Sequence, residues 1–152
     1  MTRWHEEHRQ VSELNAWQQA NAFAMLLHEV CSELTLGQDK EWLLYLLQQA
    51  GPRMREAVAE GWNQPHLAEC LFNISEALTS LALIDYYLLF LRHEGYLTGT
   101  RAAEVSDRLN ALQEALETFA ERLRETLRSA PEAGRLVDGQ NLSNLINKLR
   151  TD

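Results

Sequence analysis

The segment LAECLFNISEALTSLALIDYYLLFLRHE, residues 67–94, is the most informative part of the chain, because it contains no glycine or proline and is apolar on more than one side. One set of its side chains recurs in steps of three and four residues, which places them on one face of a helix. These are Cys70, Ile74, Ala77, Leu81, Ile84, Leu88 and Leu91. The pattern predicts a helix whose one face enters a hydrophobic core.

A second set lies on an adjacent side of the same helix, and consists of Leu67, Leu71, Leu78 and Asp85. The stretch 81–91 is apolar nearly all round, which is typical of a helix that is central or lies between subunits. Each large apolar side chain left in water forfeits about 1.5–3 kcal/mol of burial free energy. We therefore expect self-association through this second side.

A membrane-spanning helix is the alternative, because about 20 apolar residues suffice to cross a bilayer. The charged residues Glu76, Asp85 and Arg92 interrupt the segment and argue against a span. The N-terminus is polar and lacks the apolar region of a signal peptide. The sequence therefore predicts a cytoplasmic protein that does not enter the membrane.

The composition fits a globular protein of one domain. The chain has 152 residues, of which 45% are hydrophobic and 24% charged, and this length can bury a sizeable core without disulfides. Cys31 and Cys70 stand among apolar residues on different predicted helices, which indicates reduced core thiols. The formal charge of −8 argues against nucleic-acid binding driven by the overall electrostatic field of the protein, because such binding requires positive charge that neutralises phosphates.

Three further helices are expected around this segment. The first covers about residues 11–34, the second about 40–60, and the fourth about 100–129. In the first helix one stripe is assigned to the core, and a neighbouring stripe of Phe23, Leu26 and Val30 is assigned to the subunit interface. Together the segments predict an all-α, antiparallel, up-and-down four-helix bundle.

The ends of these helices carry their own signals. Asp39 is expected to cap the second helix, Gly61 to end it, and Asn63 to cap the third. Pro52 is expected to kink the second helix, because proline lacks the N–H that would reach Gln48.

The chain is expected to divide into an N-terminal extension, the bundle, and a C-terminal part. Residues 1–10 form the extension, residues 11–129 the bundle, and residues 130–152 a linker with a short amphipathic helix. That helix would place Leu142, Leu145, Ile146 and Leu149 on one side, and at about ten residues it needs a surface to dock on.

Four short motifs give the chain a family resemblance, namely Trp17-Gln18, Ala59-Glu60-Gly61, Asn73-Ile74 and Gly95-Tyr96-Leu97. Over about residues 14–127 the chain resembles the bacterial four-helix bundle family that includes the proteins encoded in 23S rRNA intervening sequences and, more distantly, accessory proteins of diversity-generating retroelements. The family's usual Asn-Ile-Ala-Glu-Gly is Ala57-Val-Ala-Glu-Gly61 here. The resemblance implies a homopentameric ring and no catalytic residues. The retroelement relatives are basic and associate with RNA.

The residues predict neither a catalytic site nor a cofactor. Inward-facing Glu-x-x-His pairs, which two-metal helical bundles require, are absent from the sequence. His5 and His8 are three residues apart, a spacing found between metal ligands. They stand near the N-terminus and no second pair of ligands accompanies them, so no metal site is assigned to them. Trp4 and Arg9 beside them could stack on single-stranded bases, although Glu6 and Glu7 dilute the charge.

Two functional hypotheses follow. The first is a non-enzymatic homo-oligomeric bundle that serves as a scaffold or protein-interaction module, with Phe23, Leu26, Val30, Leu67, Leu71, Leu78 and Asp85 at the oligomer interface. The second is an RNA or ribonucleoprotein accessory protein that binds through a local basic patch of Arg53, Arg55, Arg122, Arg124 and Arg128.

Overall fold

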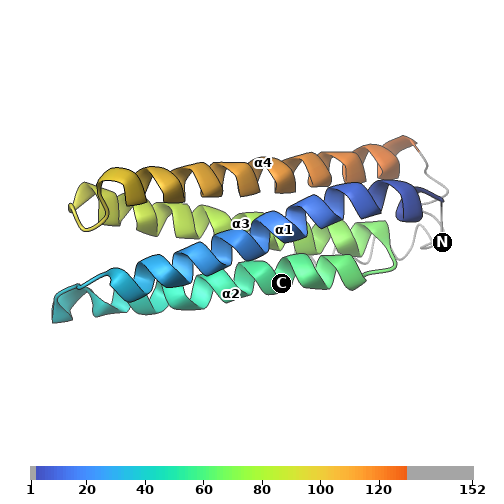
Figure 1. Ribbon diagram of the computed structural model, residues 1–152. Coiled ribbons are helices and arrows are strands. Elements are labelled where there is room, and N and C mark those ends of the chain that lie inside the picture. The colour runs from blue at the N-terminus through green and yellow to red at the C-terminus, as the bar shows by residue number, and fades with distance from the viewer. Residues whose placement is uncertain (1–2, 130–152) are drawn as a thin grey trace.

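The computed structural model describes residues 3–129, with side chains from residue 14 onward. Within that range the chain forms four long antiparallel helices and no strand (Figure 1). They are α1 (Arg3–Glu33), α2 (Glu41–Asn63), α3 (Leu67–His93) and α4 (Gly99–Ser129), with a single 3₁₀ turn, η1 (Gln38–Lys40), before α2. The predicted all-α four-helix bundle is confirmed.

The helices pack in a square, in which each helix contacts its two neighbours. The packed pairs are α1–α2, α2–α3, α3–α4 and α1–α4, so α1 lies diagonally opposite α3, and α2 opposite α4. Leucine, isoleucine, phenylalanine and alanine side chains from all four helices fill the interior. On α3 the predicted core face is buried from Cys70 to Leu91, as its steps of three and four residues require.

The interface assigned to α1 is wrong. Phe23, Leu26 and Val30 lie in the core of the single chain, and Leu67 of α3 is buried there as well. A helix that contacts two neighbours in a bundle needs a wide apolar arc, so the two stripes of α1 form one buried surface. Leu14, nearer the start of the same helix, is exposed.

Several helix ends also differ from the prediction. α1 begins at Arg3, and α2 passes through Gly61 to Asn63, whose side-chain amide donates to the Ala59 carbonyl at 3.2 Å. Asn63 therefore closes α2 and does not cap α3. No side-chain hydrogen bond caps η1 or α2, although Asp39 was the expected cap.

α2 runs without a break across Pro52. The predicted helix at 141–149 and the side chains of Trp4, His5, His8 and Arg9 lie outside the described residues.

Candidate functional site: an apolar patch on α2 and α3

The outward side of α3 carries three large exposed side chains. They are Leu83, Tyr86, which is 66% exposed, and Leu89, which is 59% exposed. Steps of three residues keep them on one side of the helix, and that side faces away from the core formed by Leu81, Ile84 and Leu88. The sequence predicted that α3 carries more apolar surface than the core can bury. The structure places this surface at Leu83, Tyr86 and Leu89, and not at the four residues that were assigned to the interface.

Of the other predicted interface residues of α3, Leu78 lies at the border with α4. Leu71 and Leu78 are half-buried and pack against the core, whereas Asp85 is exposed to solvent. Leu78 lines a shallow depression of about 700 Å³ together with charged α4 residues that include Glu121 and Arg124. Of the seven predicted interface residues, these three remain accessible from outside the chain.

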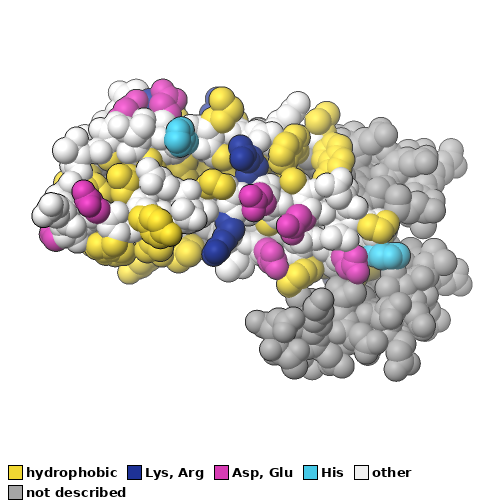
Figure 2. Space-filling model, turned by 90° about the horizontal axis from the view of Figure 1, so that it is seen from below, with side chains coloured by type: hydrophobic (Ala, Val, Ile, Leu, Met, Phe, Trp, Pro, Cys, Tyr) yellow, Lys and Arg dark blue, Asp and Glu magenta, His cyan; other side chains and the backbone are white. Residues whose placement is uncertain are grey.

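The first turns of α2 contribute two exposed aromatic side chains, Trp42 and Tyr45, and a third, Trp62, lies at the other end of the helix. α2 begins where α3 ends, because the helices are antiparallel (Figure 1). We call Trp42, Tyr45, Leu83, Tyr86 and Leu89 the apolar end patch. Figure 2 shows hydrophobic side chains gathered over this end of the bundle, at the lower left of that face.

Lys40 fixes the junction between α2 and the end of α3. Its ammonium lies 4.9 Å from the centroid of the Tyr96 ring and 6.0 Å from that of Phe90. It donates to the Tyr96 hydroxyl at 3.3 Å and to Glu94 at 3.5 Å. The hydrogen bond to Tyr96 raises the pKa of Lys40, and the cation–π contacts hold α2 against the turn that follows α3.

The exposed area of the apolar end patch is comparable with that of the largest apolar patches on typical monomers. Three aromatic and two leucine side chains, each about half exposed, present roughly 500 Å² if an aromatic side chain covers 150–250 Å². The largest apolar patch on a typical monomer is about 300–600 Å² and is often functional. The patch therefore lies at the upper end of what a soluble monomer leaves uncovered.

Two of the four motifs that carry the family resemblance meet where α2 packs on α3. Asn73 is buried, and its side-chain amide donates to Glu60 at 3.3 Å. A Cβ on Gly61 would lie 3.2 Å from Cδ1 of Ile74 and 3.4 Å from Cβ of Asn73. The absence of a side chain at Gly61 thus permits a close helix approach, and this geometry explains the motif residues by packing alone.

A third motif forms the turn between α3 and α4. Gly95 has a φ of 81°, in the left-handed region that glycine adopts without strain. The amides of Tyr96 and Leu97 both donate to the Leu91 carbonyl, at 2.9 and 3.3 Å, and Leu97 returns to the core. These contacts end α3 in the manner of a glycine C-cap.

The structure does not assemble the predicted basic patch. Arg53 and Arg55 lie on α2, whereas Arg122, Arg124 and Arg128 lie on α4, the diagonally opposite helix. Arg124 and Arg128 both pair with Glu121, at 3.5 and 2.9 Å. The sequence could not reveal this separation, because it depends on which helices are neighbours.

An ion-pair cluster joins α4 to α1. Arg101 contacts Glu29 at 2.9 Å, Glu33 at 2.6 Å and Glu104 at 2.9 Å. The hydrogen bond from Arg101 holds the pKa of Glu33 below its usual value. Because all four side chains reach solvent, each ion pair contributes little to stability on its own. Together they form a surface ion-pair network that links α4 to α1.

Metal-ligating and nucleophilic side chains are scattered. Within residues 14–129 no three His, Cys, Asp or Glu side chains come together as metal ligands. Cys31 and Cys70 are both buried and do not form a disulfide, and they lie on diagonally opposite helices. Burial raises the pKa of the Cys31 thiol to about 11, which makes it a poor nucleophile near neutral pH.

α3 has the length and apolar composition of a membrane-crossing helix, with a mean hydropathy of 1.5 over its most apolar window. Core helices of soluble proteins share this property, and ten residues of α3 are buried against the other helices. Composition alone therefore does not distinguish the two roles.

Comparison of the chain with protein-family models, with curated proteins and with solved structures finds no match. The family resemblance therefore stays a prediction, and the candidate site depends on the geometry described above.

Proposed function

We propose that the protein is a non-enzymatic bundle that associates with copies of itself through the apolar end patch and acts as a scaffold or protein-interaction module. The observation that carries this proposal is the exposure of Trp42, Tyr45, Leu83, Tyr86 and Leu89 on two adjacent helices, in the half of the bundle where α2 begins and α3 ends, on a chain whose core is already filled. The resemblance supports a ring of five copies.

The patch has the composition of an interface centre. Tryptophan and tyrosine dominate the binding energy of protein interfaces, and they make up three of the five patch residues. A standard interface buries about 800 Å² on each partner, so a patch of roughly 500 Å² would form its core and polar neighbours its rim. The exposed Asp85 and Arg92 lie along α3 where such a rim would be.

The experiment is a measurement of mass by light scattering during size-exclusion chromatography at micromolar concentration. The wild-type protein is expected to elute at a multiple of 17.5 kDa, and five copies would agree with the resemblance. Tyr86→Glu is expected to shift the mass toward the monomer, because it places a charge at the centre of the contact.

Met25→Glu is the matched control. Met25 is 70% exposed, close to the 66% of Tyr86, but it lies on α1, diagonally opposite α3. Circular dichroism should show that both variants stay helical. A wild-type monomer at all concentrations tested, or equal dissociation by the two variants, would refute the proposal.

A further inference from the structure

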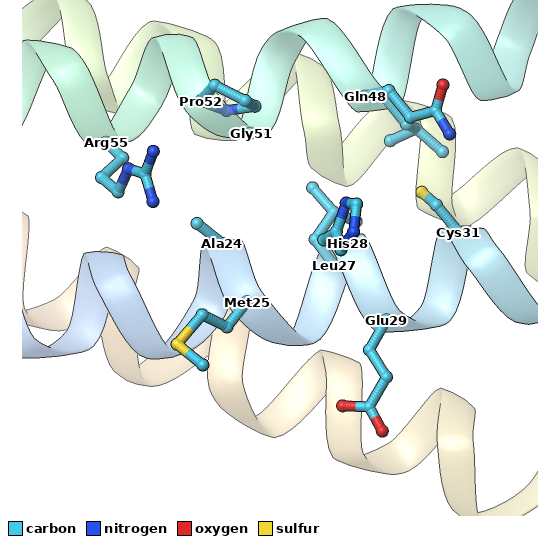
Figure 3. Close-up of a pocket in the computed structure, with 11 residues that line it drawn as sticks. Ala24, Met25, Leu27, His28, Glu29, Cys31, Gln48, Gly51, Pro52 and Arg55 are labelled. Carbon is cyan, nitrogen blue, oxygen red and sulfur yellow. The ribbon is translucent and has the colours of Figure 1, made fainter.

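A groove of about 480 Å³ lies between α1 and α2 (Figure 3), and none of the residues of the apolar end patch lines it. Apolar side chains of both helices form its floor, and these are Ala24, Leu27, Cys31 and Leu47. Gly51 keeps the floor open, because a Cβ there would lie only 3.2 Å from Cδ2 of Leu27. The volume is within the range of small-molecule sites, which are concave and mostly apolar with a few polar groups.

Arg55 provides the charge at one end of the groove. Its side chain is half-buried, and it makes no hydrogen bond or ion pair with any residue that the structure describes. Figure 3 shows its guanidinium group directed from α2 toward α1, near Ala24 and Met25. Burying part of an unpaired charge is unfavourable, and an anionic ligand would supply the missing partner.

The remaining polar side chains fit an anion at that end. Glu29, the one carboxylate among the described residues that line the groove, is already paired with Arg101 at 2.9 Å. Gln48 lies at the opposite end of the groove from Arg55 (Figure 3). The seven helical steps from Gln48 to Arg55 span roughly 10 Å at the helical rise. His28, the remaining polar side chain, lies between these two ends together with the apolar side chains of the floor (Figure 3).

We propose that this groove binds a small amphipathic carboxylate. The carboxylate pairs with Arg55, for which a two-point hydrogen-bonded pair is the favoured geometry, and the hydrocarbon chain lies on the floor along α1 toward Cys31. Met25, with its flexible thioether side chain, forms an adaptable wall. This site is separate from the self-association surface, so either proposal can fail without the other.

The test is calorimetric titration of the wild-type protein with decanoate, kept below its micelle concentration. Saturable binding to one site per chain is expected. Decanol, which has the same chain without the charge, is expected to bind at least about tenfold more weakly, because a charge-assisted pair is lost.

Arg55→Gln is expected to weaken decanoate binding about tenfold. Arg53→Gln is the matched control, since it removes the same charge from the same helix at an exposed position outside the groove, and its affinity should stay within about twofold of the wild type. Gly51→Ala narrows the floor without touching Arg55, and it should also weaken binding while the circular dichroism spectrum stays helical.

Equal losses for Arg55→Gln and Arg53→Gln would overturn the proposal, because the effect would then be one of net charge. Equal affinity for decanol and decanoate, or heat that does not saturate, would overturn it as well.

Discussion

At the scale of the residue, Asn73 illustrates what a sequence can and cannot reveal. The motifs Ala59-Glu60-Gly61 and Asn73-Ile74 were both recognised, but as separate features of two helices. That the Asn73 amide donates to Glu60 at 3.3 Å follows from how α2 packs on α3, which no local pattern encodes. In the same way Arg55 was identified only as a basic residue, because its lack of a partner appears once α1 and α2 are placed side by side.

Cys31 gives a prediction at the same scale. Burial raises the pKa of its thiol from 9.0 to about 11 in the folded protein, so the unfolded chain loses this proton at lower pH than the folded chain does. Stability therefore falls as pH rises from about 9 to about 11, by an amount on the order of 2–3 kcal/mol from this group.

The free energy of unfolding, measured by urea denaturation between pH 8 and 11, should decline more steeply for the wild type than for Cys31→Ala. Other groups that titrate in this range are common to both proteins and cancel in the comparison. Identical slopes would show that the thiol titrates equally in the folded and unfolded states.

At the scale of the element, hydrophobic periodicity predicted each helix, and the bounds of α4 agree with those expected to about one residue. The faces were harder to assign. Phe23 and Val30 were placed between subunits, although contact with both α2 and α4 buries them within the chain. The exposed residues Tyr86 and Leu89 were part of a run described as apolar all round, in which no period distinguishes the outer side from the inner one.

The α2–α3 contact at Gly61 gives the prediction at this scale. Gly61→Leu is expected to destabilise the protein by about 1–3 kcal/mol, because a side chain there overpacks against Ile74 and Asn73. The better helix propensity of leucine offsets part of this loss. Chemical denaturation followed by circular dichroism measures the change.

The control is Glu56→Leu, which adds the same side chain to α2 at an exposed position and should change stability by no more than about 0.5 kcal/mol. Equal stability of the two variants would mean that the helices can separate locally at no cost.

At the scale of the whole molecule, the sequence predicted an excess of apolar surface but could not say how much of it one chain conceals. The answer depends on the square packing, which buries Phe23, Leu26, Val30 and Leu67 and leaves the apolar end patch uncovered. Since all four helices already share a core, a single copy can fold before it associates. Association would then add to the stability of the fold and would not be a condition for it.

That distinction gives the last prediction. If copies bind one another only in the folded state, the melting temperature must rise with protein concentration, because mass action stabilises the associated form. For a chain of this size the rise should be on the order of 2 °C for each tenfold increase in concentration. Tyr86→Glu should abolish the dependence and leave a cooperative transition near the wild-type value at low concentration, whereas Met25→Glu should retain it. A wild-type melting temperature that does not change with concentration, measured by calorimetry over two decades, would mean that the apolar end patch of the folded protein is not covered by a second copy.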